Sequence, residues 1–305
     1  MSDFVNGFWN MYVMVLVALS LVYCLFVLMS NRTEKKVGGV QLHGNVWDEN
    51  IQEWNNPLPG WWMGLFWLTV LFGIAYLAMY PGFGSFKGAF GWTSLGQYED
   101  EMKKAAEKYD PIFNKFLTQD IKVVAADPEA KAMGERLFQT YCSQCHGSDA
   151  KGAKGFPNLT DSDWLYGGEP EQIETTIKGG RQGMMPPFAH LGADTIKDAA
   201  NYVRSLSGMA ADSTRAQRGK EVFMANCSPC HGQDAKGNTA IGAPNLSDST
   251  WLYGSSEGTV TETITMGRQN RMPAFQEFLG DAKIHLLAAY IYGKSAGAAP
   301  KAETK

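Results

Sequence analysis

The chain has 305 residues, enough for two or three domains of ordinary size. Its formal net charge is −4 and it has no Lys/Arg block, which gives no basis for nucleic-acid binding. Five cysteines are too few for a disulfide scaffold. Four of them fall in two C-x-x-C-H motifs. The fifth, Cys24, lies in an apolar run, where cysteine acts as a small apolar side chain.

Two long apolar runs lie near the N-terminus. Residues 8–29 form 22 positions without a charge, and residues 61–80 form 20. Since a helix rises about 1.5 Å per residue, each run is long enough to cross a hydrocarbon core of about 30 Å. The alternative, a cleaved signal peptide and a buried helix, disagrees with Asp3, with the lack of Lys or Arg before the first run, and with the lack of an A-x-A site after it. We predict two transmembrane helices in contact with membrane lipid.

The charges beside the two runs predict their orientation. Arg32, Lys35 and Lys36 directly follow the first run, whereas the segment after the second run carries only Lys87. Under the positive-inside rule, residues 31–60 are a cytoplasmic loop and both chain ends lie on the outer side of the membrane.

A linker is predicted between the second run and the first C-x-x-C-H motif. A stretch rich in glycine and aromatic residues, 81–92, precedes a helical pattern over 94–118 that has opposite charges spaced four residues apart. The Asp110-Pro111 pair is predicted to break or restart this helix, because proline disfavours helical backbone at the residue before it.

From about residue 127 the chain repeats itself. The first unit contains CSQCHG, PNLTDSDWLYG and RQGMMPPF, and the second contains CSPCHG, PNLSDSTWLYG and RQNRMPAF. Matching positions lie 85 residues apart at Cys142 and Cys227, and 87 apart at Met185 and Met272. A nearly constant offset over this length indicates a duplicated domain.

Each repeat carries a C-x-x-C-H motif, which is the attachment motif of c-type haem. Two thiols at this spacing lie close together on a turn that enters a helix, where both can form thioethers to the porphyrin vinyl groups. A redox dithiol would need a βαβ context, and one shared Cys₄ zinc site would leave both histidines unexplained. We predict two covalently bound haem c groups, attached at Cys142, Cys145, Cys227 and Cys230, with His146 and His231 as axial iron ligands.

A methionine beside proline recurs in each repeat and is predicted to supply the sixth iron ligand. Met185 lies 39 residues after the histidine of its motif, and Met272 lies 41 after its own. Met184 aligns with Arg271 and is the weaker candidate. His/Met ligation raises the reduction potential and leaves no open position for a substrate, which favours electron transfer. The sequence leaves open whether each methionine binds the iron of its own repeat or of the other.

The helices around the motifs predict the small all-α cytochrome c fold. Gly134 and Phe138 lie on adjoining turns before the first motif, where glycine permits close approach of the C-terminal helix that carries Tyr202. The corresponding residues of the second repeat are Gly219, Phe223 and Tyr290. The predicted fold class is all-α, with two N-terminal transmembrane helices followed by two tandem class I-like cytochrome c domains.

Two further pairs of residues recur at matching positions. Trp164 and Trp251 either pack in the core or donate the indole N–H to a haem propionate. Arg181 and Arg268 are either surface charges or partners of a propionate, and we favour the latter.

These patterns divide the chain into segments, with a short hinge at 209–214 between the repeats. The segments are transmembrane helix 1 (1–30), a cytoplasmic loop containing WNNPLP (31–60), transmembrane helix 2 (61–80), a linker with an amphipathic helix (81–126), cytochrome c domain 1 (127–208), cytochrome c domain 2 (212–295) and a disordered tail (296–305).

The stretch between the apolar runs carries a family resemblance. Residues 46–62, VWDENIQEWNNPLPGWW, resemble the signature of the dihaem subunit (CcoP) of cbb3-type cytochrome c oxidases, and the resemblance continues through YPGFGSFKGAFGW at 80–92 and both repeats. It implies a non-catalytic electron-transfer subunit of a proton-translocating oxidase, multi-pass in the bacterial inner membrane, with the N-terminus and the haem domains in the periplasm. The implied partners are the catalytic haem–copper subunit, the monohaem cytochrome c subunit and a soluble or membrane cytochrome c donor.

Two other functions compete with this interpretation. A free-standing membrane-anchored dihaem carrier of the c4 kind would have the same repeat. A dihaem peroxidase would need one iron with a displaceable ligand, which the paired Met-Pro motifs oppose.

Residues 54–62, WNNPLPGWW, are a rigid aromatic corner at the predicted cytoplasmic face. Our hypothesis is that this corner docks the chain against the catalytic subunit, with Asp48, Glu49 and Glu53 as polar contacts.

Overall fold

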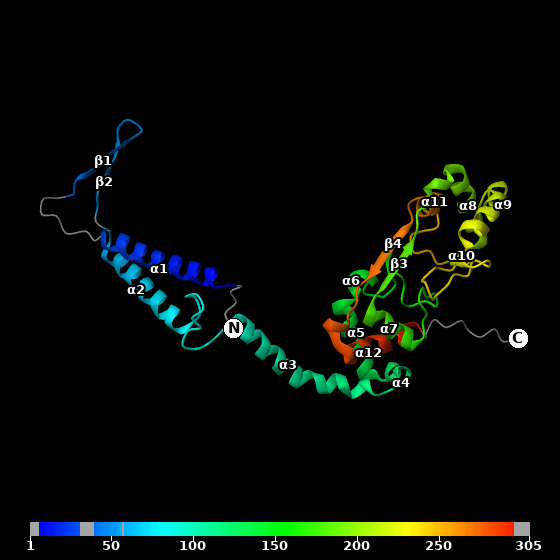
Figure 1. Cartoon of the computed structure of the whole chain (residues 1–305), viewed down its shortest axis with the longest axis horizontal. Helices are drawn as coiled ribbons and strands as arrows, with labels where there is room; N and C mark the ends of the chain where they lie inside the picture. Colours follow the sequence, from blue (N-terminus) through cyan, green and yellow to red (C-terminus); the bar gives the residue numbers. More distant parts are fainter. Residues whose placement is uncertain (1–5, 31–39, 57, 296–305) are drawn as a thin grey trace. The chain divides into compact units, whose positions relative to one another are not determined.

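The computed structural model describes residues 6–30, 40–56 and 58–295 (Figure 1). The chain forms two units, Met1–Ala106 and Glu107–Lys305. The basic residues used for orientation, Arg32, Lys35 and Lys36, and the predicted tail at 296–305 lie outside the described residues.

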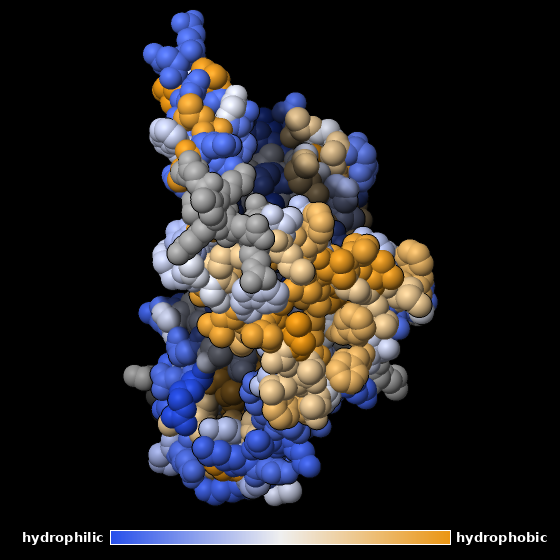
Figure 2. Space-filling view, turned by 90° about the vertical axis from the view of Figure 1, so that its left-hand side faces the viewer, coloured by the Kyte–Doolittle hydropathy of each residue, from blue (hydrophilic) through white to orange (hydrophobic). Residues whose placement is uncertain are grey.

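The first unit contains the two apolar helices, α1 (Gly7–Ser30) and α2 (Gly60–Met79). Both are long and apolar enough to cross a membrane, and their side chains are almost entirely exposed. Figure 2 shows the apolar surface that gathers over this unit. Exposed apolar helices without a protein core around them are expected for membrane-spanning segments, where lipid replaces water.

A polar contact ties α1 to the segment that follows α2. The Asn10 side-chain carbonyl accepts a hydrogen bond of 2.6 Å from the backbone N–H of Ser85. Gly84 has a positive φ of 59°, and a Cβ there would collide with Asn10 and Met14. Glycine therefore permits the loop to close over α1 at this point.

The loop between the two helices contains a β-hairpin that the sequence did not predict. Strands β1 (Leu42–Trp47) and β2 (Ile51–Trp54) pair antiparallel, with Trp47 opposite Ile51. The turn between them places two non-glycine residues, Asp48 and Glu49, at positive φ.

The helix predicted at 94–118 is present as α3 (Ser94–Leu117), but it does not break at Pro111. The prediction at Asp110-Pro111 was wrong. Proline removes one intrahelical N–H and leaves the carbonyl of Glu107 without its usual donor. Glu107 is exposed, so water can satisfy that carbonyl and the helix continues.

The second unit is built from short helices and one two-stranded ribbon. The elements after α3 are α4 (Ile121–Ala126), α5 (Pro128–Tyr141), α6 (Ser143–His146), α7 (Pro170–Gly179), β3 (Arg181–Met185), the 3₁₀ helix η1 (Ala189–Leu191), α8 (Ala193–Leu206), α9 (Ser213–Asn226), α10 (Ser228–His231), α11 (Glu257–Met266), β4 (Arg268–Met272) and α12 (Gln276–Ser295).

These elements form two hydrophobic cores, and neither core follows the sequence repeats. The first, which we call the split body, combines the end of α3, α4, α5 and α7 with α12 from the far end of the chain. The second, the continuous body, contains α8, α9 and α11, so its chain runs without interruption from about Met185 to Ile264. The continuous body is thus inserted in the chain between the two parts of the split body, as the colours of Figure 1 show.

The two sequence repeats exchange their C-terminal segments through the β3–β4 ribbon, so that α8 lies in the continuous body and α12 in the split body. Its strands pair antiparallel from Arg181 opposite Met272 to Met185 opposite Arg268, so each strand runs from one body to the other. The backbone N–H of Phe275 donates to Ile177 in the split body (3.1 Å), and that of Phe188 donates to Ile264 in the continuous body (3.0 Å).

A glycine starts each crossing strand. Gly180 has φ 66° and ψ −176°, and Gly267 has φ 69° and ψ −178°. A Cβ on Gly180 would collide with the carbonyl oxygen of Met272, and one on Gly267 would collide with that of Met185. This backbone region is essentially restricted to glycine, so the sequence directs the crossing at two points.

The exchange corrects two expectations. We predicted that Gly134 faces Tyr202, but a Cβ on Gly134 would meet Tyr290 (2.6 Å to its Cβ), and Gly219 instead faces Tyr202 (2.9 Å). The prediction of contacts within each repeat was therefore wrong.

The segment at 209–214 does not act as a hinge between the bodies. It joins α8 to α9 inside the continuous body, where Asp212 caps α9 by accepting from Arg215 N–H. The split core also reaches back to Phe116, Ile121 and Val124, residues that the sequence assigned to the linker. The contiguous ranges 127–208 and 212–295 describe the repeats but not the packed bodies.

Replacing Gly180 or Gly267 by alanine is expected to reduce the free energy of unfolding by about 1–3 kcal/mol, because alanine is strained in this backbone region and collides with the partner strand. Urea unfolding of the haem-loaded protein measures the change. Gly179→Ala is the matched control, since Gly179 is helical and a Cβ added to it would meet no atom within 4 Å. An equal loss for Gly179→Ala would contradict the assignment.

Candidate haem sites

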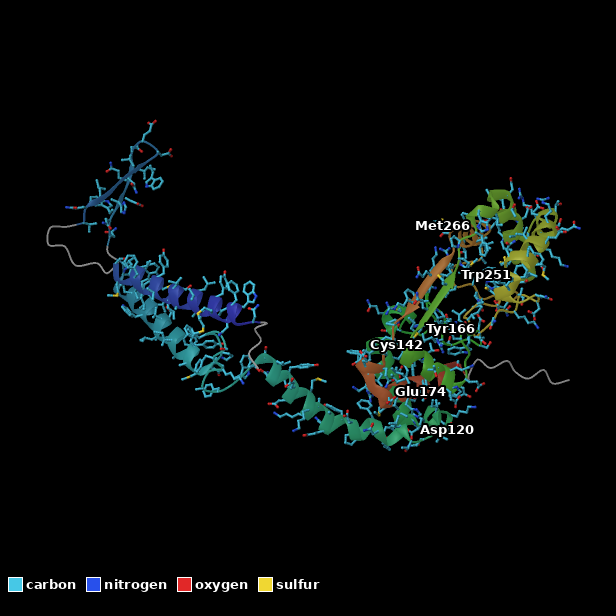
Figure 3. The ribbon with its side chains drawn as sticks, in the orientation of Figure 1. Asp120, Cys142, Tyr166, Glu174, Trp251 and Met266 are labelled. Carbon is cyan, nitrogen blue, oxygen red and sulfur yellow. The ribbon has the colours of Figure 1, made fainter. Side chains whose placement is uncertain are left out.

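Each C-x-x-C-H motif forms one tight helical turn at the end of a longer helix. Cys142 is the C-cap of α5 and the N-cap of α6, and the backbone N–H of His146 donates to Cys142 (3.0 Å). Cys227 and His231 repeat this geometry at the junction of α9 and α10, also at 3.0 Å. The second cysteine of each motif is exposed and the first is half-buried, and Cys142 lines the pocket that also contains His146. Figure 3 labels Cys142 at this junction.

Both motif histidines are held through one ring nitrogen. His146 Nδ1 lies 3.0 Å from the carbonyl oxygen of Pro157, and His231 Nδ1 lies 3.0 Å from that of Pro244. A carbonyl partner fixes the proton on Nδ1 and leaves Nε2 as the free electron pair, which is the arrangement of a metal-binding histidine. Burial lowers the pKa of both rings and so favours the neutral form that binds metal.

The pocket beside His146 is apolar and contains the methionine of the other repeat. Its lining residues are Cys142, His146, Leu159, Ile177, Met272, Phe275, Leu279, Leu287 and Ile291. Met185, the methionine predicted from the first repeat, lies elsewhere, against the core of the continuous body together with Phe188 and Cys227. The structure therefore brings Met272 to His146 and Met185 to the body that contains His231.

These residues fit a porphyrin. The first site combines an imidazole, a thioether sulfur and an apolar lining, and in the continuous body Met185 and Cys227 pack on the same apolar core. The second cysteine of each motif is exposed. In the continuous body the indole Nε1 of Trp251 is buried with no hydrogen-bond partner among the described residues. A buried unpaired donor is costly, and a haem propionate would satisfy it. Figure 3 labels this tryptophan.

The recurring tryptophans and arginines take the following positions. Trp164 packs on the split core and Trp251 on the continuous core. Arg181 donates to the Thr176 hydroxyl (2.9 Å), and Arg268 donates to Thr263 (2.7 Å). The arginines therefore anchor the first residues of the two ribbon strands, a role that the sequence interpretation did not include.

Sequence reasoning also missed two tyrosines in the repeated WLYG segments. Tyr166 lies under the Arg181 guanidinium, 4.8 Å from carbon to ring centre, and Tyr253 lies under that of Arg268 at 4.3 Å. Each tyrosine also reaches the other body: a Cβ added to Gly242 would collide with the Tyr166 ring, and one added to Gly155 would lie 3.5 Å from the Tyr253 ring. Recurrence of WLYG in both repeats was the available signal.

Comparison with known proteins agrees with this geometry. A family described as the N-terminal domain of cytochrome oxidase-cbb3, FixP, matches residues 39–87, and one described as cytochrome c oxidase, cbb3-type, subunit III, matches residues 129–203 and 214–291. The cbb3-type cytochrome c oxidase subunit CcoP of Rubrivivax gelatinosus is 48% identical over 97% of both chains. The chain belongs to the CcoP/FixP family of cbb3-type oxidase subunits.

Other members of the CcoP/FixP family match nearly as broadly. CcoP of Rhodobacter capsulatus is 38% identical over 85% of this chain and 96% of its own, and FixP of a Bradyrhizobium species is 40% identical over 86% and 97%. The family resemblance predicted from residues 46–62 is thus confirmed, as are two cytochrome c domains, two haem c groups and a membrane anchor.

The contact between the bodies contains a group of carboxylates. Burial, together with the smaller effect of the nearby charges of Asp248 and Asp161, raises the pKa of Asp163 from 3.8 to about 6. A folded-state pKa above the unfolded value means that the folded protein binds the extra proton between pH 3.8 and about 6. As pH rises through this interval, Asp163 must lose its proton in a half-buried place, and the free energy of unfolding therefore falls.

Asp163→Asn is expected to raise the thermal unfolding midpoint relative to the unchanged protein at pH 8, because it removes a half-buried charge, and to leave it nearly unchanged at pH 4. Calorimetry at both pH values measures the difference. The exposed Asp100→Asn is the control and should shift neither midpoint. A larger gain at pH 4 than at pH 8 would contradict the sign of the pKa shift.

Proposed function

We propose that this chain is the dihaem electron-transfer subunit of a cbb3-type oxidase and that its two irons are ligated crosswise by the methionines of opposite repeats. When bound, haem c supplies a one-electron iron couple. The observation that carries the proposal is the presence of Met272, and not Met185, in the apolar pocket of His146.

The proposed ligands follow from the packing. Cys142 and Cys145 would hold the first haem c, and His146 and Met272 would bind its iron. The second set is Cys227 and Cys230 for attachment and His231 and Met185 for the iron. The support is the shared pocket in the split body and the packing of Met185 and Cys227 on one core in the continuous body.

The residues around each iron have three roles. The carbonyls of Pro157 and Pro244 orient the histidines, the apolar linings exclude water, and the ribbon carries both methionines on one rigid element. A methionine ligand in an apolar site favours the reduced iron and raises its potential. With two protein ligands, each iron would have no position for oxygen or peroxide, which favours electron transfer in this chain and catalysis in another subunit.

The membrane arrangement is also a proposal. We place α1 and α2 across the bacterial inner membrane, with residues 31–60 in the cytoplasm and the N-terminus and both haem bodies in the periplasm. The support is the Lys/Arg excess after α1 in the sequence, against Lys87 alone after α2. Electrons then come from a soluble or membrane cytochrome c and pass toward the monohaem and catalytic haem–copper subunits.

Crosswise ligation is tested in chains that hold one haem. In the Cys142→Ala/Cys145→Ala background only the second haem remains. Met185→Leu is then expected to abolish the methionine–iron charge-transfer band and to give a high-spin spectrum, whereas Met272→Leu leaves both unchanged.

The reciprocal background, Cys227→Ala/Cys230→Ala, is the control and should reverse the roles of the two methionines. Loss of the band with Met272→Leu in the first background would instead establish ligation within each repeat. Circular dichroism of each variant separates loss of a ligand from loss of the fold.

Membership of the oxidase complex is tested by extraction in mild detergent. The complex purified through this chain is expected to contain haem c, haem b and copper together. Purification of the chain with haem c alone would favour the free-standing membrane-anchored carrier.

A further inference from the structure

The β1–β2 hairpin has no packing partner in the part of the chain that the structure describes. Every side chain of both strands is exposed. A two-stranded hairpin is at best marginally stable alone in water, because it has no third strand or helix to bury its apolar side chains. This hairpin therefore needs a surface to pack on.

Its exposed side chains are large and apolar. Trp47 and Ile51 face each other across the strands with 58% of their surfaces exposed, and Trp54 is 61% exposed opposite Leu42. Aromatic residues are enriched in protein interfaces, and clustered exposed apolar side chains mark interaction sites. Figure 2 shows the mixture of apolar and hydrophilic residues on this part of the first unit.

The charge of the hairpin identifies the kind of partner. The described residues 40–56 carry Asp48, Glu49 and Glu53 and no lysine or arginine. Anionic phospholipid headgroups repel such a surface. The cytoplasmic loops of membrane proteins carry an excess of lysine and arginine, which attracts it.

Two of these carboxylates lie at the turn, where the backbone has positive φ. Asp48 has φ 49° and Glu49 has φ 69°. Such turns favour Asn, Asp or Gly, so Asp48 suits its position and Glu49 is the unfavourable residue. A glutamate there presents a charge at the tip of the hairpin, although glycine would suit the backbone better.

We propose that the hairpin of residues 42–54 docks on a lysine- or arginine-bearing loop of a membrane-embedded subunit of the oxidase, on the membrane face opposite the haem bodies. Trp47, Ile51 and Trp54 supply the apolar contact, and the three carboxylates supply the electrostatic one. This inference rests on the proposed oxidase function and orientation.

Site-specific photo-cross-linking in the intact complex tests the partner. A benzophenone amino acid replaces Trp47, and the control replaces the exposed Tyr98 of α3. The expected result is a covalent adduct between position 47 and a second protein subunit, with a much lower yield from position 98. No adduct, an adduct confined to phospholipid or to the chain itself, or equal yields from both positions would overturn the proposal.

The electrostatic part is tested with Asp48→Gly/Glu49→Gly, which relieves the turn while it removes two charges. The yield of copper and haem b recovered with this chain is expected to fall about tenfold at moderate salt, as for the loss of two surface ion pairs. The control Glu99→Gln/Asp100→Asn removes two charges from α3 and should leave the yield unchanged.

The two hypotheses fail in different ways. If the unchanged chain purifies without copper and haem b, the oxidase function itself fails. If the unchanged chain recovers both but the hairpin variant recovers them equally, only the docking proposal fails. Haem c content of all variants should stay the same, which shows that the haem bodies are intact.

Discussion

The antiparallel pairing of Arg181–Met185 with Arg268–Met272 determines the arrangement of the haem-binding half of the molecule. The ribbon sends each methionine into the body built around the other repeat's C-x-x-C-H motif. Gly180 and Gly267 permit the crossing, and Arg181 and Arg268 anchor its ends on threonine and tyrosine. The two methionines that we propose as iron ligands therefore lie on one shared structural element.

The shared ribbon also relates the two sites by an approximate twofold axis. Gly183 pairs with Asn270 at the centre, and these two positions correspond in the repeats. The exchange is not fully symmetric, because the Tyr253 hydroxyl donates to Asn270 (2.5 Å), whereas the buried Tyr166 hydroxyl has no partner among the described residues. Such differences place the two haem sites in different polar surroundings. Different surroundings are one way in which a protein gives two similar haem groups different reduction potentials.

The sequence predicted the chemistry well and the path of the chain less well. The spacing of cysteine and histidine predicts haem attachment, and uncharged runs of about twenty residues predict the two apolar helices that the structure contains. The exchange of C-terminal helices between the repeats was not predictable, because both repeats carry nearly the same contact residues. From the sequence alone, Gly134 could pack against Tyr202 or Tyr290 equally well. The hairpin at 42–54 was missed since its apolar residues do not alternate as those of a half-buried strand do. Pro111 was misjudged because an exposed helix can lose one hydrogen bond to water.

The order of segments along the chain has a consequence for how the protein is made. The continuous body is complete once residues up to about 267 have been synthesised, whereas the split body lacks α12 until nearly the whole chain exists. The first C-x-x-C-H motif to leave the ribosome thus belongs to the last pocket to close. Loss of residues after 272 by truncation or proteolysis would damage the haem site at Cys142, near the middle of the chain, and leave the later site at Cys227 with its own core.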